Sequence, residues 1–123
     1  MALIAIVDDS KLARVFNAAA LKKLGHELLE IEPVSLFGVL GTLKETTPDV
    51  MIVDYLMPGC PGPSLIRACH EDASLASIKV IMLTAHHEEE ILNRMVNLGV
   101  QHVLHKPVDP KVLEETVTQL LAD

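Results

Sequence analysis

Short apolar runs alternate with longer amphipathic stretches along the whole chain. The runs occupy residues 3–7, 28–31, 50–53, 80–83 and 103–104. Continuous apolar runs of this length are typical of strands that are buried on both faces, as in a parallel sheet. Turn-forming residues bound these runs, which favours strands over segments of buried helix. The pattern therefore predicts five strands.

Five amphipathic helices are predicted between and after these strands. Their starts are marked by N-cap or first-turn residues: Ser10, Ser35, Pro63, Glu88 and Asp109. The second helix is expected over residues 35–44 and the third over 63–71. Gly25 and Gly99 supply the ends of the first and the fourth helix. The buried face of the first helix is expected to carry Ala13, Phe16, Ala20 and Leu24.

Strict alternation of strand and helix predicts a single α/β domain over residues 1–123. We expect a doubly wound, five-stranded parallel sheet of order 2-1-3-4-5 with five flanking helices. In such a sheet, the functional site lies at the carboxyl ends of the strands, where the strand order reverses.

Composition excludes several classes of protein. Half of the residues are apolar and 22% are charged, which argues against disorder. Ten basic residues against seventeen acidic ones leave a formal net charge of −7. An acidic surface repels nucleic acid and anionic lipid, so we expect no direct binding to either. No stretch approaches the length of a membrane span, and we expect a soluble cytoplasmic protein.

The two cysteines, Cys60 and Cys69, match no zinc-binding or redox spacing. We therefore interpret them as reduced thiols in a reducing compartment.

Polar residues follow the ends of four predicted strands. Asp8 and Asp9 end the first strand and Asp54 ends the third. Thr84 ends the fourth strand and Lys106 ends the fifth. Because the carboxyl ends of parallel strands meet at one edge of a sheet, we expect these side chains to converge.

This set of residues suits phosphoryl transfer. Clustered carboxylates repel one another, and a hard divalent cation such as Mg²⁺ relieves the repulsion through oxygen ligands. Asp8 and Asp9 are the natural metal holders, and Asp54 is the natural nucleophile. The ammonium of Lys106 and the hydroxyl of Thr84 supply charge and hydrogen bonds to phosphoryl oxygens.

Ordered motifs along the chain carry a resemblance to a known family. They are Val7-Asp8-Asp9-Ser10, then Asp54-Tyr55-Leu56-Met57-Pro58-Gly59, then Thr84-Ala85, and finally Gly99 leading to Lys106-Pro107. With these motifs the chain resembles the receiver domain of two-component response regulators, of the kind found in chemotaxis regulators. The resemblance covers essentially the whole chain and implies a flavodoxin-like fold.

The resemblance also implies roles for individual residues. Asp54 would accept the phosphoryl group, and Thr84, the Ala85 amide and Lys106 would hold its oxygens. The implied Mg²⁺ ligands are the carboxylates of Asp8, Asp9 and Asp54 and the backbone carbonyl of Leu56. The bond between Lys106 and Pro107 is expected to be cis.

The switch implied by the resemblance departs from the family pattern at one position. Phosphorylation would repack the surface of helix four, strand five and helix five, and an aromatic residue three before the lysine usually moves with it. Here that position is Val103, which has no ring to swing. His102 and His105 flank it and are candidate substitutes. The same surface is a candidate homodimer face.

The implied partners are a histidine kinase or phosphotransfer protein and an unknown output protein or fused effector domain. The chain would be no enzyme beyond its own phosphorylation and dephosphorylation. One alternative is a degenerate receiver that binds partners without phosphorylation. Another is a Mg²⁺-dependent phosphohydrolase, but Leu56 stands where such enzymes place a second acid. His86 and His87 are expected to be solvated, with His86 a candidate border to the path of attacking water.

Overall fold

The computed structural model describes residues 2–123, which form alternating strands and helices. The strands are β1 (Leu3–Val7), β2 (Glu27–Ile31), β3 (Val50–Asp54), β4 (Lys79–Thr84) and β5 (His102–His105). The helices are α1 (Lys11–Lys22), α2 (Leu36–Glu45), α3 (Gly62–Glu71), α4 (Glu89–Asn97) and α5 (Pro110–Ala122). Every predicted strand and helix is present, and most boundaries lie within two residues of the expected ones.

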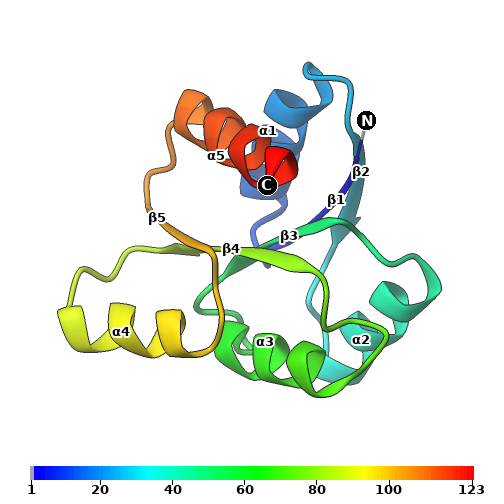
Figure 1. The fold of residues 1–123 in the computed structure, drawn as a ribbon, viewed down its shortest axis with the longest axis vertical. Coiled ribbons are helices and arrows are strands. Elements are labelled where there is room, and N and C mark those ends of the chain that lie inside the picture. The colour runs from blue at the N-terminus through cyan, green and yellow to red at the C-terminus, as the bar shows by residue number, and fades with distance from the viewer. Residues whose placement is uncertain (1) are drawn as a thin grey trace.

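The strands form one parallel sheet with the order β2-β1-β3-β4-β5, which confirms the predicted topology. Figure 1 shows α1 and α5 on one side of this sheet and α2, α3 and α4 on the other. The strand order reverses between β1 and β3, so the loops that follow these two strands turn toward opposite faces.

Two apolar cores lie on the two faces of the sheet. Met51 and Val53 of β3 belong to the core that includes residues of α2, α3 and α4. Val50 and Ile52 belong to the core that includes residues of α1 and α5. Alternate residues of one strand therefore enter different cores, which explains why the strand is apolar at consecutive positions.

Local capping fixes the ends of the helices as the sequence predicts. The side chains of Ser10, Ser35 and Asp109 each accept a hydrogen bond from a backbone N–H in the first turn of their helix. Gly25 and Gly99 have φ values of +88° and +87°, a backbone conformation that favours glycine.

The predicted buried face of α1 is wrong in part. Phe16 is 56% exposed and Leu24 is 45% exposed, whereas Arg14 and Asn17 are buried with Leu21. The buried face of α1 is therefore turned away from the predicted one. It includes Arg14, whose guanidinium donates a hydrogen bond to the backbone carbonyl of Asp8 in the loop before α1. A pattern of apolar spacing assigns such polar residues to solvent, so it misplaces the stripe.

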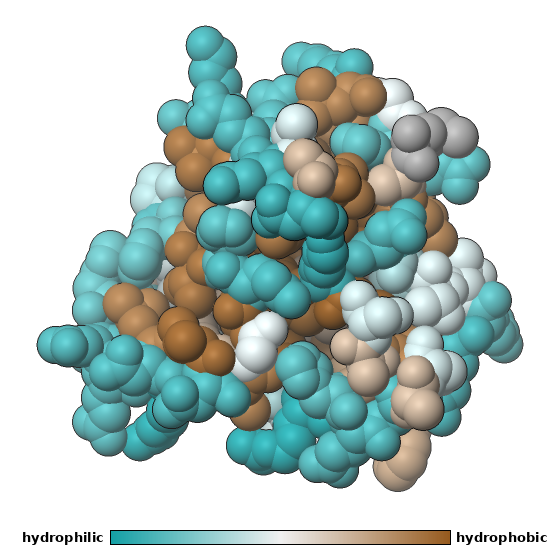
Figure 2. Space-filling view, viewed as in Figure 1, coloured by the Kyte–Doolittle hydropathy of each residue, from teal (hydrophilic) through white to brown (hydrophobic). Residues whose placement is uncertain are grey.

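The surface is largely hydrophilic at its periphery in the view of Figure 2. Hydrophobic side chains show between the helix layers and gather over α4. No helix within residues 2–123 has the length and apolar character needed to cross a bilayer.

Both cysteines are free thiols and are buried in the core. Burial raises the pKa of Cys60, and it raises the pKa of Cys69 to about 11. Because the thiolate is the reactive form, neither group is prepared for redox chemistry.

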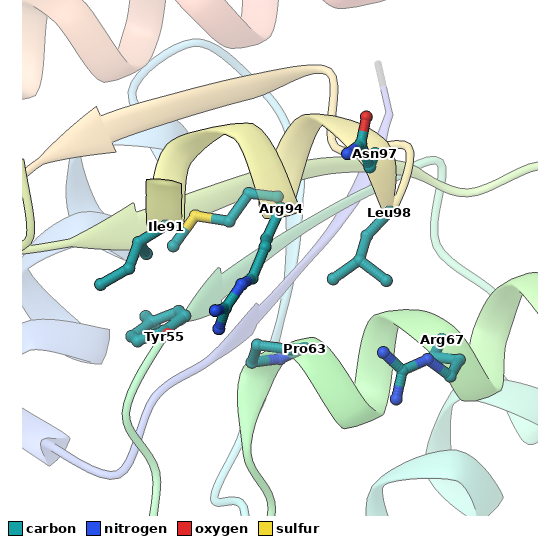
Figure 3. A pocket seen from close by; sticks show the side chains of 8 residues that line it. Tyr55, Pro63, Arg67, Ile91, Arg94, Asn97 and Leu98 are labelled. Carbon is teal, nitrogen blue, oxygen red and sulfur yellow. The ribbon is translucent and has the colours of Figure 1, made fainter. Parts of the chain in front are cut away.

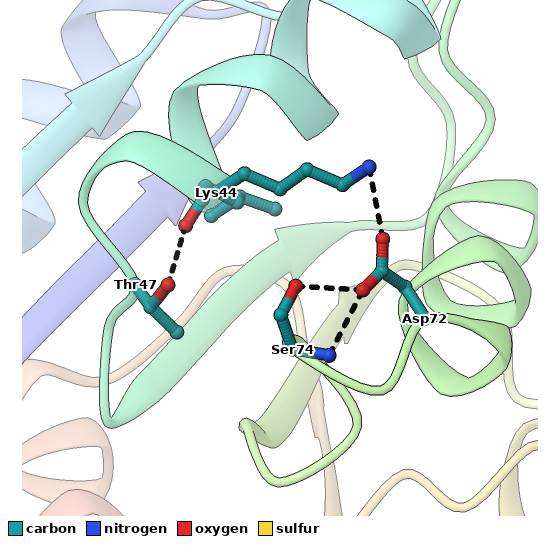
Figure 4. A network of polar contacts seen from close by, with 5 residues as sticks. Lys44, Thr47, Asp72 and Ser74 are labelled. Atoms are coloured by element: carbon teal, nitrogen blue, oxygen red, sulfur yellow. Dashed lines mark hydrogen bonds and ion pairs between the residues drawn. The ribbon is translucent and has the colours of Figure 1, made fainter.

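A polar network joins the end of α2 to the loop after α3 (Figure 4). The Lys44 ammonium lies 2.9 Å from one carboxylate oxygen of Asp72. The other oxygen accepts hydrogen bonds from the hydroxyl and the backbone N–H of Ser74 at 2.6 and 2.9 Å. The Ser74 hydroxyl, followed by Lys44, lowers the pKa of Asp72 to about 2.

We expect Ser74→Ala to raise the pKa of Asp72 toward its ordinary value of 3.8, because the hydroxyl stabilises the ionised carboxylate. Since folding lowers this pKa, the stabilisation is complete above pH 3.8 and is lost as the pH falls toward 2. A carbon-13 NMR titration of the Asp72 carboxyl measures the shift. Ser77→Ala, in the same loop, is the control, and an unchanged titration in Ser74→Ala would contradict the prediction.

Candidate functional site

The structure brings the polar residues at the strand ends together at one edge of the sheet. Asp8 and Asp9 follow β1, Asp54 and Thr84 are the last residues of β3 and β4, and Lys106 follows β5. The parallel registers of β1, β3, β4 and β5 align these ends. A small cavity at this edge is lined by Asp54, Tyr55, Leu56, Thr84, Ala85, His86 and Lys106.

Three carboxylates crowd this edge. Oxygens of Asp8, Asp9 and Asp54 all lie within 4.8 Å of one another. Asp8 is 1% exposed and Asp54 is 6% exposed, whereas Asp9 faces solvent. Like charges at this separation destabilise one another, and burial strengthens the effect because little water screens them.

Asp8 has one carboxylate oxygen with a partner and one without. Oδ1 accepts a hydrogen bond from the backbone N–H of Ser10 at 2.9 Å. Oδ2 is buried and has no hydrogen-bond partner among residues 2–123. Burial raises the pKa of Asp8, and the neighbouring Asp54 charge raises it further. A buried oxygen without a donor, in a cluster of oxygen ligands, fits a hard divalent cation.

One ammonium group partly balances the cluster. The Nζ of Lys106 lies 2.8 Å from Oδ1 of Asp54. The backbone N–H of Lys106 donates to the Thr84 carbonyl at 2.9 Å. The latter bond extends the pairing of β4 and β5 to the residue that carries the charge. The peptide bond between Lys106 and Pro107 is cis. One positive charge against three carboxylates leaves the edge negative when the carboxylates are ionised.

Thr84 is buried and faces the same cavity. Its Oγ1 accepts a hydrogen bond from the backbone N–H of His86 at 3.0 Å, which leaves the hydroxyl hydrogen for another acceptor. Ala85, which lies between them, is exposed and also lines the cavity. The His86 ring pairs with a Glu88 oxygen at 3.2 Å and meets the Tyr55 ring edge to face.

The start of α3 packs onto the backbone of Asp54 and Tyr55 at the end of β3. Gly62 donates its N–H to the Tyr55 carbonyl at 3.1 Å. A Cβ at residue 62 would lie 2.6 Å from the Asp54 carbonyl oxygen, so only glycine fits without a backbone shift. The sequence analysis did not assign this role, because the close approach of two backbones leaves no signal in local spacing.

Arg14 is a second supporting residue that the sequence pattern missed. Its Nη1 donates to the backbone carbonyl of Asp8 at 2.6 Å from a buried position in α1. This hydrogen bond links α1 to the backbone of the loop that carries Asp8 and Asp9.

The sequence comparison decides the family. A family model described as the response regulator receiver domain matches residues 4–118. The chain belongs to this family. Receiver domains are signalling domains of two-component systems, so the chain is not a classical enzyme. This result does not favour the alternative of a degenerate, phosphorylation-independent module.

Individual relatives agree with this assignment. Protein PilH of Pseudomonas aeruginosa is 34% identical over 122 residues, which cover 99% of each chain. The phosphate regulon transcriptional regulatory protein PhoB of the same species is 33% identical over 110 residues, which are 89% of this chain but 47% of that protein. The structure of chemotaxis protein CheY4 of Vibrio cholerae superposes with a TM-score of 0.88 at 25% identity and covers 98% of both chains.

Val103 stands at the predicted switch position, and histidines lie near it in β5 and in the loop after β4. Val103 is partly buried and packs against the core beneath α4. The rings of His87 and His105 stack with their centroids 4.2 Å apart and an angle of 5° between the planes. This contact joins the loop after β4 to the last residue of β5.

We expect Arg14→Met to destabilise the receiver domain by about 1.5–3 kcal/mol, because the Asp8 carbonyl loses a charged hydrogen-bond donor. Urea unfolding monitored by circular dichroism measures the change. Lys11→Met removes one positive charge from the exposed start of the same helix and is the control. Equal stability of the two variants would contradict a supporting role for Arg14.

Proposed function

We propose that this receiver domain is switched by phosphorylation of Asp54, with a histidine kinase or a phosphotransfer protein as the donor. One observation carries the proposal. The Asp54 carboxylate is buried at the edge of the sheet with the Lys106 ammonium on one oxygen and two further carboxylates beside it. The stability of the fold does not require a buried cluster of charges. Phosphoryl transfer uses each of these groups: a carboxylate nucleophile, an ammonium that neutralises charge, and carboxylates that bind a metal ion.

In the transfer, an Asp54 oxygen forms a bond to phosphorus while the bond from phosphorus to the donor's imidazole nitrogen breaks. The electron pair of that bond stays on the nitrogen. The Lys106 ammonium neutralises charge that develops on the phosphoryl oxygens, and the Thr84 hydroxyl and the Ala85 N–H donate to them. The burial of Asp54 and Thr84 excludes water and strengthens these interactions.

The proposed metal ligands are the carboxylates of Asp8, Asp9 and Asp54 and the backbone carbonyl of Leu56. The unpartnered Oδ2 of Asp8 supports this assignment, since oxygen ligands without histidine or cysteine suit Mg²⁺. Bound Mg²⁺ would supply charge neutralisation to the phosphoryl oxygens.

Exposed apolar side chains near the acceptor support docking of a protein donor. Leu12 is 82% exposed on α1, and Phe16 lines a groove that also includes Asp8 and Lys106. Leu56, two residues after the acceptor, is 66% exposed. Solitary exposed apolar residues are common on proteins. A group of them around the site of phosphorylation is typical of a surface that another protein covers.

The proposed output surface is formed by α4, β5 and α5, and it is also the proposed homodimer face. The stack of His87 on His105 supports a route from Thr84 to this surface that does not need an aromatic residue at Val103. The match to PilH spans the whole of that protein, whereas PhoB is about twice as long as the matched region. We propose that residues 1–123 form one receiver domain, which acts on a separate output protein or on a fused effector domain.

We expect one phosphoryl adduct on the protein after incubation with Mg²⁺ and acetyl phosphate, and none on Asp54→Asn. Intact-mass spectrometry under neutral conditions measures the adduct. Asp49→Asn is the matched control, because Asp49 is exposed and its side chain accepts a hydrogen bond from the Leu3 N–H, remote from Asp54. An adduct that persists in Asp54→Asn, or that forms equally without a divalent cation, would refute this assignment.

We further propose that the domain dephosphorylates itself and that His86 influences the rate, since its ring borders the cavity of Asp54. His86→Ala removes the imidazole ring from the edge of the cavity. We expect this to change the lifetime of the acyl phosphate by roughly two- to tenfold. Decay of the mass adduct after removal of the donor measures it. His26→Ala, remote from the cavity, is the control, and identical decay in all three proteins would remove His86 from the mechanism.

A further inference from the structure

A groove between α3 and α4 lies outside the machinery proposed for phosphorylation. It has a volume of about 360 Å³ and an apolar floor that includes Ile91 and Met95 of α4 and Leu98, which directly follows this helix. Tyr55 and Pro63 also line it. Figure 3 shows the guanidinium of Arg94 pointing from α4 into the groove, with Leu98 at the end of this helix and Arg67 on α3.

Positive charge is concentrated here in an acidic protein. The chain has three arginines and a formal net charge of −7. Arg14 is buried behind the acidic loop, and the other two, Arg67 and Arg94, both line this groove. No ion pair within residues 2–123 involves Arg67.

Arg94 forms an ion pair at the surface with Glu90 of the same helix. Its Nη2 lies 3.0 Å from Oε1 of Glu90, one helical turn away, with side chains that are 70% and 79% exposed. Such exposed pairs are weak and exchange readily for a better-placed carboxylate. Glu90 therefore acts as an internal competitor for any acidic ligand of Arg94.

We propose that the α3–α4 groove is a second binding site, which takes a segment of a partner protein that carries carboxylates beside a bulky aliphatic side chain. The aliphatic group sits on the floor of Ile91, Met95 and Leu98, and the carboxylates bind Arg67 and Arg94. Tyrosine and arginine around an apolar floor are the residue types that contribute most at protein interfaces. The charge of the rim selects an acidic partner, because the rest of the protein repels one.

This site shares one wall with the phosphorylation cavity. Tyr55 lines both, and its ring contacts His86. The groove does not depend on phosphorylation of Asp54, so binding is expected in the unmodified protein and its test is independent of the proposed function.

Tyr55 provides a direct readout, because the chain has one tyrosine and no tryptophan. The probe is a short blocked peptide in which glutamates flank two leucines, titrated into the full chain without phosphodonor. We expect saturable change in tyrosine fluorescence and amide NMR shifts centred on α3 and α4. Shifts centred elsewhere, or none at millimolar peptide, would overturn the proposal.

Charge variants test the recognition in both directions. The double variant Arg67→Gln/Arg94→Gln is expected to weaken binding roughly tenfold, and Glu90→Gln is expected to tighten it about twofold by releasing Arg94. The control Lys22→Gln/Lys23→Gln removes the same charge from the exposed end of α1 and is expected to change binding less than about twofold. Circular dichroism establishes that each variant is folded. Equal binding by all variants, or by a peptide with glutamine in place of glutamate, would refute the charge recognition.

Discussion

The candidate site depends on three carboxylates and one ammonium that the fold holds at a single edge of the sheet. Oxygens of Asp8, Asp9 and Asp54 lie within 4.8 Å of one another, and only Lys106 forms an ion pair with them among residues 2–123. Left alone, this cluster is a source of instability, since two of its acids are largely removed from water. The same imbalance makes the edge a receptor for a cation and for a phosphoryl group.

The rest of the structure resists this repulsion. Apolar strands buried on both faces fix the backbone positions from which the acids project. Arg14 holds the Asp8 carbonyl from behind, and Gly62 lets α3 start directly on the backbone of Asp54. These supports act on the backbone rather than on the carboxylates, so they position the acids without neutralising them.

Tyr55 lies between two regions of different chemistry. On one side is the acidic cavity of Asp54, and on the other is the groove with Arg67 and Arg94. Because a ligand in either region would contact the same ring, occupation of one is able to alter affinity for the other, and such coupling is reciprocal. On the side of the sheet covered by α2, α3 and α4 (Figure 1), the helices therefore carry the proposed binding groove as well as part of the core.

The sequence alone determined the order of elements, the topology and the acids, Thr84 and Lys106 at the strand ends, because periodicity and capping are local and parallel strands place their ends together. It did not determine which face of α1 is buried, since the inward position of Arg14 depends on a hydrogen bond to Asp8 that no spacing encodes. The close approach at Gly62, the stack of His87 on His105 and the placement of Arg67 and Arg94 along one groove were likewise decided by tertiary structure. In each case the partners come from different elements, and only packing of the helices on the sheet sets their separation.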